Sequence, residues 1–237
     1  MNKKTKIIIL LAVAMVLIYT FVQNEKPKTK TANDFKVINE ENYLGSSTTL
    51  LDGIYTAKEG AVIYWDGKNP LLDNFINKGE LQIKNAQLKI KNNEVTGDVI
   101  FDMNSITTTS TATGAGFNSL DDHLKGVDFF DTDHYGESHL EIQKITDGIL
   151  YGELTIKDVT QEISLPVHVS YNQNDLNISG KTKIDRTLWG IQYASKKFSN
   201  NIKENLIDDF LGVEFSLDLT TEETPAVSPS IETEPIF

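Results

Sequence analysis

Apolar side chains recur at every second residue through most of the segment 41–220. This two-residue period is that of a β-strand with one buried face, because successive side chains of a strand point to opposite sides. The pattern predicts at least seven short strands. Their apolar positions are Leu81, Ile83, Leu88 and Ile90; Val95, Val99, Phe101 and Met103; Leu140 and Ile142; Leu150, Leu154 and Ile156; Ile163, Leu165, Val167 and Val169; Leu176 and Ile178; Ile184; and Val213, Phe215, Leu217 and Leu219.

Turn signals separate these strands at short intervals. Asn92-Asn93 and Asp147-Gly148 stand between successive alternating runs, and a third polar turn spans Asn172–Asp175. Strands joined in this way pair in antiparallel order. One apolar face per strand gives a single interior, and closing the sheet leaves no bare edges. The sequence therefore predicts an all-β fold, an eight-stranded antiparallel barrel that holds packed side chains or one small ligand. Gly97 and Gly152 either remove bulk from this interior or mark bends in the strands.

The segment 121–131 breaks the two-residue period. Leu124, Val127 and Phe130 recur at every third position, which indicates a short helical segment with one apolar edge. One of the two aspartates that begin the segment is expected to cap its N-terminus. We interpret the segment as a plug that closes one side of the barrel. Polar residues on its other side are expected to tie it down by hydrogen bonds, namely His123 and Asp128.

Both ends of the chain differ in composition from the middle. Residues 1–22 hold three lysines and then sixteen uncharged residues, about 24 Å of helix against a hydrocarbon core of ~30 Å. This fits a signal peptide or a short hydrophobic membrane helix, and the poor cleavage site favours the uncleaved anchor. Residues 23–40 are interpreted as a flexible tether, and residues 221–237 as a disordered acidic tail. One domain, residues 41–220, remains.

Charge and residue types exclude several kinds of function. A net charge of −12 argues against nucleic acid, which needs a basic face. The chain has no cysteine, so it forms neither a disulfide framework nor a thiolate metal site. Residues 131–136 begin like a calcium loop but lack its later oxygen ligands, and the histidine spacings match no helical zinc pair. We therefore expect no metal, no cofactor and no catalytic residue.

Four motifs occur in the same order as in a known family. HLKGVDFFD (residues 123–131) with the following Asp133 and Tyr135 resembles the signature of the YceI-like family. GELTIKDVT continuing to ISLPV (152–167) is similar to its hairpin, IDRTLWGI (184–191) to its tight turn, and IDDF (207–210) to the start of its closing strand. The chain departs from the family pattern at Asp158, where glycine is usual, and the histidine usual near the first strand is not apparent.

The resemblance implies a lipocalin-like, eight-stranded barrel with a helical segment, exported to the bacterial cell envelope. It also implies binding of a polyisoprenoid, an isoprenoid quinone or a similar amphipathic lipid inside the barrel. The domain is then expected on the periplasmic side of the inner membrane, held by the N-terminal segment or secreted to the periplasm. An apolar pocket suffices for such a ligand, since each buried methylene contributes roughly 0.8 kcal/mol.

The predicted ligand-binding residues are the inward positions of the strands and a tight turn: Val99, Phe101, Met103, Leu150, Leu154, Leu165, Val167, Arg186, Trp189, Phe215 and Leu217. The apolar members alternatively form a dry packed core. Arg186, the single arginine, either pairs with Asp185, stacks beside Trp189 or meets a ligand head group. The leading hypothesis is a non-enzymatic lipid carrier or sequestration protein. The alternatives are a protein-interaction module with a filled barrel and a hydrolase or isomerase using His123 with a carboxylate.

Overall fold

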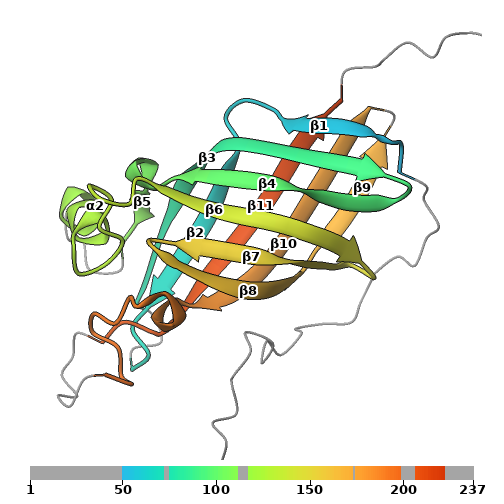
Figure 1. Cartoon of the computed structure of the whole chain (residues 1–237). Helices are drawn as coiled ribbons and strands as arrows, with labels where there is room; N and C mark the ends of the chain where they lie inside the picture. Colours follow the sequence, from blue (N-terminus) through green and yellow to red (C-terminus); the bar gives the residue numbers. More distant parts are fainter. Residues whose placement is uncertain (1–49, 72–74, 112–116, 173, 199–205, 222–237) are drawn as a thin grey trace, which may run out of the picture. The chain divides into compact units, whose positions relative to one another are not determined.

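The computed structural model describes residues 50–71, 75–111, 117–172, 174–198 and 206–221 (Figure 1). The chain divides into two units, residues 1–34 and 35–237, and every described residue belongs to the second. The predicted N-terminal helix, the tether and all of the predicted tail except Thr221 lie outside the described residues. In the part of the chain that the structure describes, no helix is long and apolar enough to cross a membrane.

Strands of the described residues form one antiparallel sheet, accompanied by a single α-helix. This confirms the predicted all-β antiparallel class with a short helical segment. The helix is α2 (Phe117–Lys125), and two 3-10 turns are η1 (Met103–Ser105) and η2 (Arg186–Trp189). The strands are β1 (Gly53–Ala57), β2 (Val62–Lys68), β3 (Ile76–Lys91), β4 (Glu94–Asp102), β5 (Thr107–Ser110), β6 (Glu137–Thr146), β7 (Ile149–Ile156), β8 (Val159–Pro166), β9 (His168–Asn172), β10 (Asp175–Asp185) and β11 (Phe210–Thr220).

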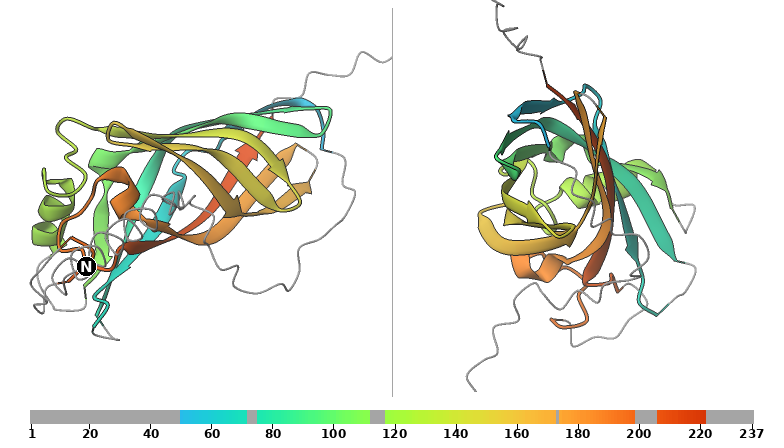
Figure 2. Two further views of the ribbon diagram at one scale, coloured as in Figure 1. Left: turned by 60° about the horizontal axis from the view of Figure 1, so that its bottom comes forward. Right: turned by 90° about the vertical axis from the view of Figure 1, so that its right-hand side faces the viewer.

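The eleven strands differ in number from the predicted eight, and nine of them follow one another along the sheet. The order is β8-β7-β6-β4-β3-β1-β11-β10-β9. β1 and β2 share one position because each pairs with both β3 and β11, while β5 pairs with β3 alone. β8 and β9 are separated in the chain only by Val167. Both edges of the sheet therefore belong to one continuous stretch of chain, and Figure 2 shows the sheet curving around its interior.

Two hairpin turns form where the sequence predicted them. Asn92 and Asn93 both have positive φ, 51° and 67°, as do Asp147 and Gly148 at 50° and 70°. Two consecutive residues of positive φ match the right-handed twist of the strands that they join. Asn, Asp and Gly tolerate this conformation better than other residues. These turns join β3 to β4 and β6 to β7 at the same end of the sheet.

That end of the interior is packed solid. Tyr55, Leu88, Ile90, Leu176 and Leu219 are almost completely buried there. Gly97 and Gly152 do not contribute empty space, since a Cβ on either would lie 2.2 Å from Gln87 O or 2.1 Å from Glu141 O. Both glycines let the neighbouring strands approach closely. Of the two roles expected for them, this agrees with a bend or close approach of strands and not with the removal of bulk from the interior. We call this part of the sheet the closed end.

The segment 121–131 lies at the opposite end and differs in part from the prediction. Leu124 and Phe130 are buried as expected, but Val127 is 72 % exposed. The helix ends at Lys125, so the three-residue period does not continue to Val127. The helix also begins four residues before Asp121, whose carboxylate instead accepts hydrogen bonds from the main-chain N and Oγ1 of Thr108, at 2.7 and 2.5 Å. Asp121 therefore attaches α2 to β5, and it does not cap the N-terminus of the helix.

Candidate functional site

An apolar cavity of about 210 Å³ lies inside the sheet. Inward-facing side chains of β2, β3, β4, β6, β7, β8, β10 and β11 make its wall, and the accessible wall is almost entirely carbon. Ligand pockets are typically concave and apolar, with a few polar groups that orient the ligand. The site can therefore hold the apolar part of a ligand.

Segments outside the strands cover the cavity at the end away from the closed end. They are the β2–β3 connection, α2 with the turn after it, and the connection from η2 to β11. Lys68, Phe75, Asn77, His123 and Ile207 line the cavity here and are also partly or fully exposed. The cavity thus reaches the surface between these three segments, and we call this place the mouth.

Nine of the eleven predicted site residues line the cavity, although their contact with a ligand stays a prediction. They come from four strands and the two 3-10 turns: Val99, Phe101, Met103, Leu150, Leu154, Leu165, Arg186, Phe215 and Leu217. Because strand side chains alternate between the two faces, the apolar face of each strand supplies the wall.

The remaining two predicted residues, Val167 and Trp189, are buried but do not line the cavity. Val167 lies between β8 and β9, next to the packed closed end. Trp189 belongs to η2, and its Nε1 donates a hydrogen bond to Leu154 O on β7 at 3.0 Å. Gln161 Nε2 on β8 likewise donates to Leu188 O in η2 at 3.0 Å. These two hydrogen bonds attach η2 to β7 and to β8.

Several wall residues were not predicted. Ile63 and Trp65 come from β2, and Phe129 comes from the turn after α2. The Trp65 ring lies over Gly79, where a Cβ would be 2.3 Å from the ring. The short uninterrupted apolar run of residues 61–65 (AVIYW) was the available signal for β2. Phe129 follows no strand period, and only its burial identifies it.

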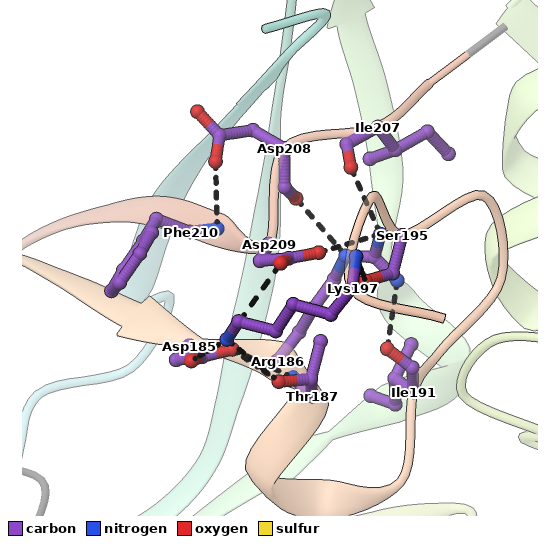
Figure 3. Close-up of polar contacts among 10 residues, drawn as sticks. All are labelled: Asp185, Arg186, Thr187, Ile191, Ser195, Lys197, Ile207, Asp208, Asp209 and Phe210. Carbon is purple, nitrogen blue, oxygen red and sulfur yellow. Dashed lines mark hydrogen bonds and ion pairs between the residues drawn. The ribbon is translucent and has the colours of Figure 1, made fainter. Parts of the chain in front are cut away.

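Arg186 is the most buried charged residue of the described chain, with 1 % exposure. Its guanidinium donates from Nη1 to Ile191 O at 2.7 Å, from Nε to Asp208 O at 3.0 Å and from Nη2 to Ile207 O at 3.1 Å (Figure 3). Burial lowers the pKa of Arg186, and Asp209, 3.9 Å from Nη2, opposes that shift. Arg186 thus joins both sides of the η2–β11 connection.

Of the three alternatives left open for Arg186, these contacts rule out an ion pair with Asp185. Its carboxylate neighbour is Asp209 and not Asp185, and its planar group lies over Phe129, 5.4 Å from the ring centroid. Asp185 instead pairs with Lys197, whose Nζ is 2.6 Å from Oδ2 (Figure 3). Burial raises the pKa of Asp185, but hydrogen bonds from Lys197 and Thr187 outweigh burial and lower it overall. The cluster holds the chain beside the mouth in place.

The described histidines lie in different surroundings. His123 lines the cavity, with its ring centroid 4.5 Å from that of Tyr193 and 5.9 Å from that of Phe129. His134 pairs with Asp131 and His139 with Asp98, at 2.9 and 2.8 Å, and none of these four residues lines the cavity. Within the described residues, no three His, Cys, Asp or Glu side chains gather as a metal site would require. Of the polar wall atoms, Ser138 Oγ is buried without a hydrogen-bond partner.

Comparison with known proteins assigns the fold to a family. The family model described as a YceI-like domain matches residues 71–219, which run from the β2–β3 connection almost to the end of β11. The chain belongs to the YceI-like family. A relative from Staphylococcus aureus (strain bovine RF122 / ET3-1), UPF0312 protein SAB2563, is 30% identical over 132 residues, which are 48% of this chain and 77% of the relative.

Two solved structures share the YceI-like fold. A polyisoprenoid binding domain from Saccharophagus degradans is 10% identical, with a TM-score of 0.55, covering 73% of this chain and 100% of that domain. BcnA from Burkholderia cenocepacia is 17% identical, with a TM-score of 0.52, covering 67% of this chain and 95% of its own. At such identities the likeness concerns the fold.

Proposed function

We propose that this protein binds a long-chain amphipathic lipid of the polyisoprenoid or isoprenoid quinone type, without catalysis, for transport, storage or sequestration in the cell envelope. The observation that carries the proposal is the carbon-walled cavity inside the sheet, which reaches the surface at the mouth. An interior filled by side chains would have favoured the interaction module instead. The polyisoprenoid binding domain from Saccharophagus degradans, which shares the fold, supports this class of ligand.

The proposal includes closure of the sheet into a lipocalin-like barrel. Its two edges, β8 and β9, are consecutive in the chain. At their junction the strands come close, since a Cβ on Gly180 of β10 would lie 2.8 Å from Pro166 O of β8. Next to this junction, Trp189 of η2 donates a hydrogen bond to β7, and Gln161 of β8 donates one to η2. A closed wall keeps water away from an apolar ligand, which is what makes binding favourable.

Cavity size limits how much of a lipid the present conformation takes. The volume of about 210 Å³ exceeds the roughly 150 Å³ of a dry apolar cavity that binds benzene, but it is below the roughly 300–1,000 Å³ of ordinary ligand pockets. At about 30 Å³ per water-sized group, it holds about seven methylenes, worth about 5 kcal/mol of transfer free energy. A longer chain extends through the mouth or displaces wall side chains.

Chain-length dependence of binding tests the proposal. Titration calorimetry of the full chain with n-alcohols should show affinity rising about fourfold per methylene until about seven carbons are buried, with smaller gains beyond. Val99→Phe, which fills part of the cavity, should weaken binding, whereas Val127→Phe makes the same change at an exposed site. Affinity that is independent of chain length, or equal in both variants, would refute lipid binding in the cavity.

Cell-envelope location forms part of the proposal and rests on the sequence of residues 1–22. An apolar ligand of this kind resides in membranes, and a protein that exchanges it is expected to work beside one. Fractionation of cells that produce the full chain, with and without residues 1–22, measures this directly. Recovery of the full chain in the cytosolic fraction would contradict the location without affecting the ligand-binding experiment.

A further inference from the structure

Exposed apolar side chains gather around the mouth. Five large ones belong to the β2–β3 and η2–β11 connections or to the first residue of the strand that follows each, and we call them the mouth patch: Leu71, Ile76, Tyr193, Phe198 and Phe210. At the closed end the turns are polar, with Asn92-Asn93 and Asp147-Gly148 at their tips. Leu51, Ile54 and Tyr151 are the large exposed apolar residues of that end. The apolar surface is thus concentrated where the cavity opens.

Contacts along the chain connect the members of the patch. Ile76 is the cross-strand neighbour of Lys68, whose main-chain O accepts a hydrogen bond from Asp208 N at 2.8 Å. Phe210 follows two residues later, and its ring lies 5.9 Å from Lys197 Nζ, next to Phe198. These contacts make the β2–β3 connection and the η2–β11 connection one surface.

Tyr193 joins this surface to the cavity wall. Its ring packs edge-on against His123, which lines the cavity from α2. The Ile207 main-chain N, also at the wall, donates to Ala194 O at 3.0 Å. A surface that seats on the patch would therefore meet the opening of the cavity itself.

The residue types fit the boundary between lipid head groups and acyl chains. Between Tyr193 and Phe198 stand Lys196 and Lys197, both exposed. Aromatic rings and lysines favour this boundary, since rings place apolar area in the acyl region and lysines keep their charge in water. The net charge of −12 makes an anionic surface unfavourable, so the matching surface is zwitterionic.

We propose that the mouth patch docks on a zwitterionic lipid bilayer and places the mouth of the cavity directly against the acyl chains. The inference rests on the proposed function and adds the route of loading. A lipid that crosses water from a membrane to the cavity exposes its tail, at roughly 0.8 kcal/mol per methylene. Docking removes that exposure. A protein partner would not need the patch to surround the opening, and a second copy would block it.

Because the chain has no cysteine, single cysteines can report the position of each surface in the full chain. Phe198→Cys and Ile54→Cys form a matched pair, since both side chains are 55 % exposed at opposite ends of the sheet. Each variant carries an environment-sensitive fluorophore and is mixed with phosphatidylcholine vesicles that contain no isoprenoid. We expect a blue shift and quenching by spin-labelled lipid at position 198, and neither at position 54.

Three results would overturn docking by the patch. An unchanged spectrum at position 198 would show that the patch stays in water. Equal shifts at both positions would show adsorption without orientation, including adsorption caused by residues 1–22 alone. A blue shift that grows with protein concentration in the absence of vesicles would identify a second copy as the occupant. Val99→Phe in the labelled variant separates the two proposals, because it should weaken lipid binding in the cavity and leave the blue shift intact.

Discussion

Arg186 offers the sharpest test of how the mouth is held. The arginine donates to three main-chain carbonyls, of Ile191, Ile207 and Asp208, and lies beside the buried Asp209. Arg186→Met keeps a long apolar stem and removes every donor. One buried and two partly buried carbonyls then lose their hydrogen bonds. Asp209, which already has one carboxylate oxygen without a hydrogen-bond partner, loses a neighbouring positive charge.

The expected loss follows from these contacts. Hydrogen bonds that involve a charged group contribute about 1.5 kcal/mol or more each, so three give about 4.5 kcal/mol. Removing one partner of a buried ion pair costs about 3–5 kcal/mol, which agrees with the sum for the three hydrogen bonds. We expect Arg186→Met to lower the free energy of unfolding by about 4 kcal/mol, a large part of the roughly 5–15 kcal/mol typical of a domain.

Urea unfolding of the full chain, followed by the fluorescence of its two tryptophans, measures this loss. Lys58→Met is the control, because it removes an exposed ion pair with Asp175 and is expected to change stability by less than about 1 kcal/mol. Arg186→Met with Asp209→Leu should lose less than the single variant, since the single variant leaves the buried Asp209 carboxylate with Lys197, at 3.7 Å, in place of two cations. A loss below about 1 kcal/mol in Arg186→Met would refute the structural role. Weaker lipid binding at unchanged stability would instead assign Arg186 to a ligand head group.

Two further predictions concern packing and acid stability. Gly79→Ala places a Cβ 2.0 Å from Thr107 O and 2.3 Å from the Trp65 ring, so we expect a loss of about 1–3 kcal/mol in urea unfolding, with Gly67→Ala, whose Cβ has 3.5 Å to Leu211, as the near-neutral control. Equal losses would contradict the steric reason. The pKa of Asp185 is lower in the folded protein than in the unfolded chain. The stabilisation that its ionised carboxylate gives is therefore complete above the unfolded pKa of about 3.9, and it is lost as the pH falls through the pKa of the folded protein. In Asp185→Asn the free energy of unfolding should therefore fall less steeply below about pH 4 than in the unchanged protein. The same steepness in both proteins would contradict this.

The sequence predicted the strands wherever alternation ran long enough. β4, β7 and β11 each carry several apolar positions on one face, and that face is the interior. β1, β2 and β5 were missed for local reasons. β5 has the sequence TTTS and carries no apolar residue, and β1 buries Tyr55 alone. Their pairing with β3 is a tertiary property that a short segment does not reveal.

The wall of the site was largely predictable, but its limits along the strands were not. Alternation gives the face of each side chain and says nothing about which end of the interior is filled. Val167 therefore looked equivalent to Leu165, although it lies beside the packed closed end. The covering residues, such as Phe129 and Ile207, follow no period because they lie outside the strands. Only the folded chain brings them together.

Different forces hold the wall and the mouth, and this has a consequence for loading. The wall belongs to strands whose main-chain groups are paired in the sheet, so its shape changes only if the sheet changes. Ile191 and Ile207, at the covered end, are held by hydrogen bonds from the Arg186 guanidinium to their carbonyls. Loss of two or three such bonds can shift the covering segment while every strand stays paired. Under the proposed function, we expect a lipid too long for about 210 Å³ to displace the chain at Ile191 and Ile207, beside the mouth patch, before it displaces any strand.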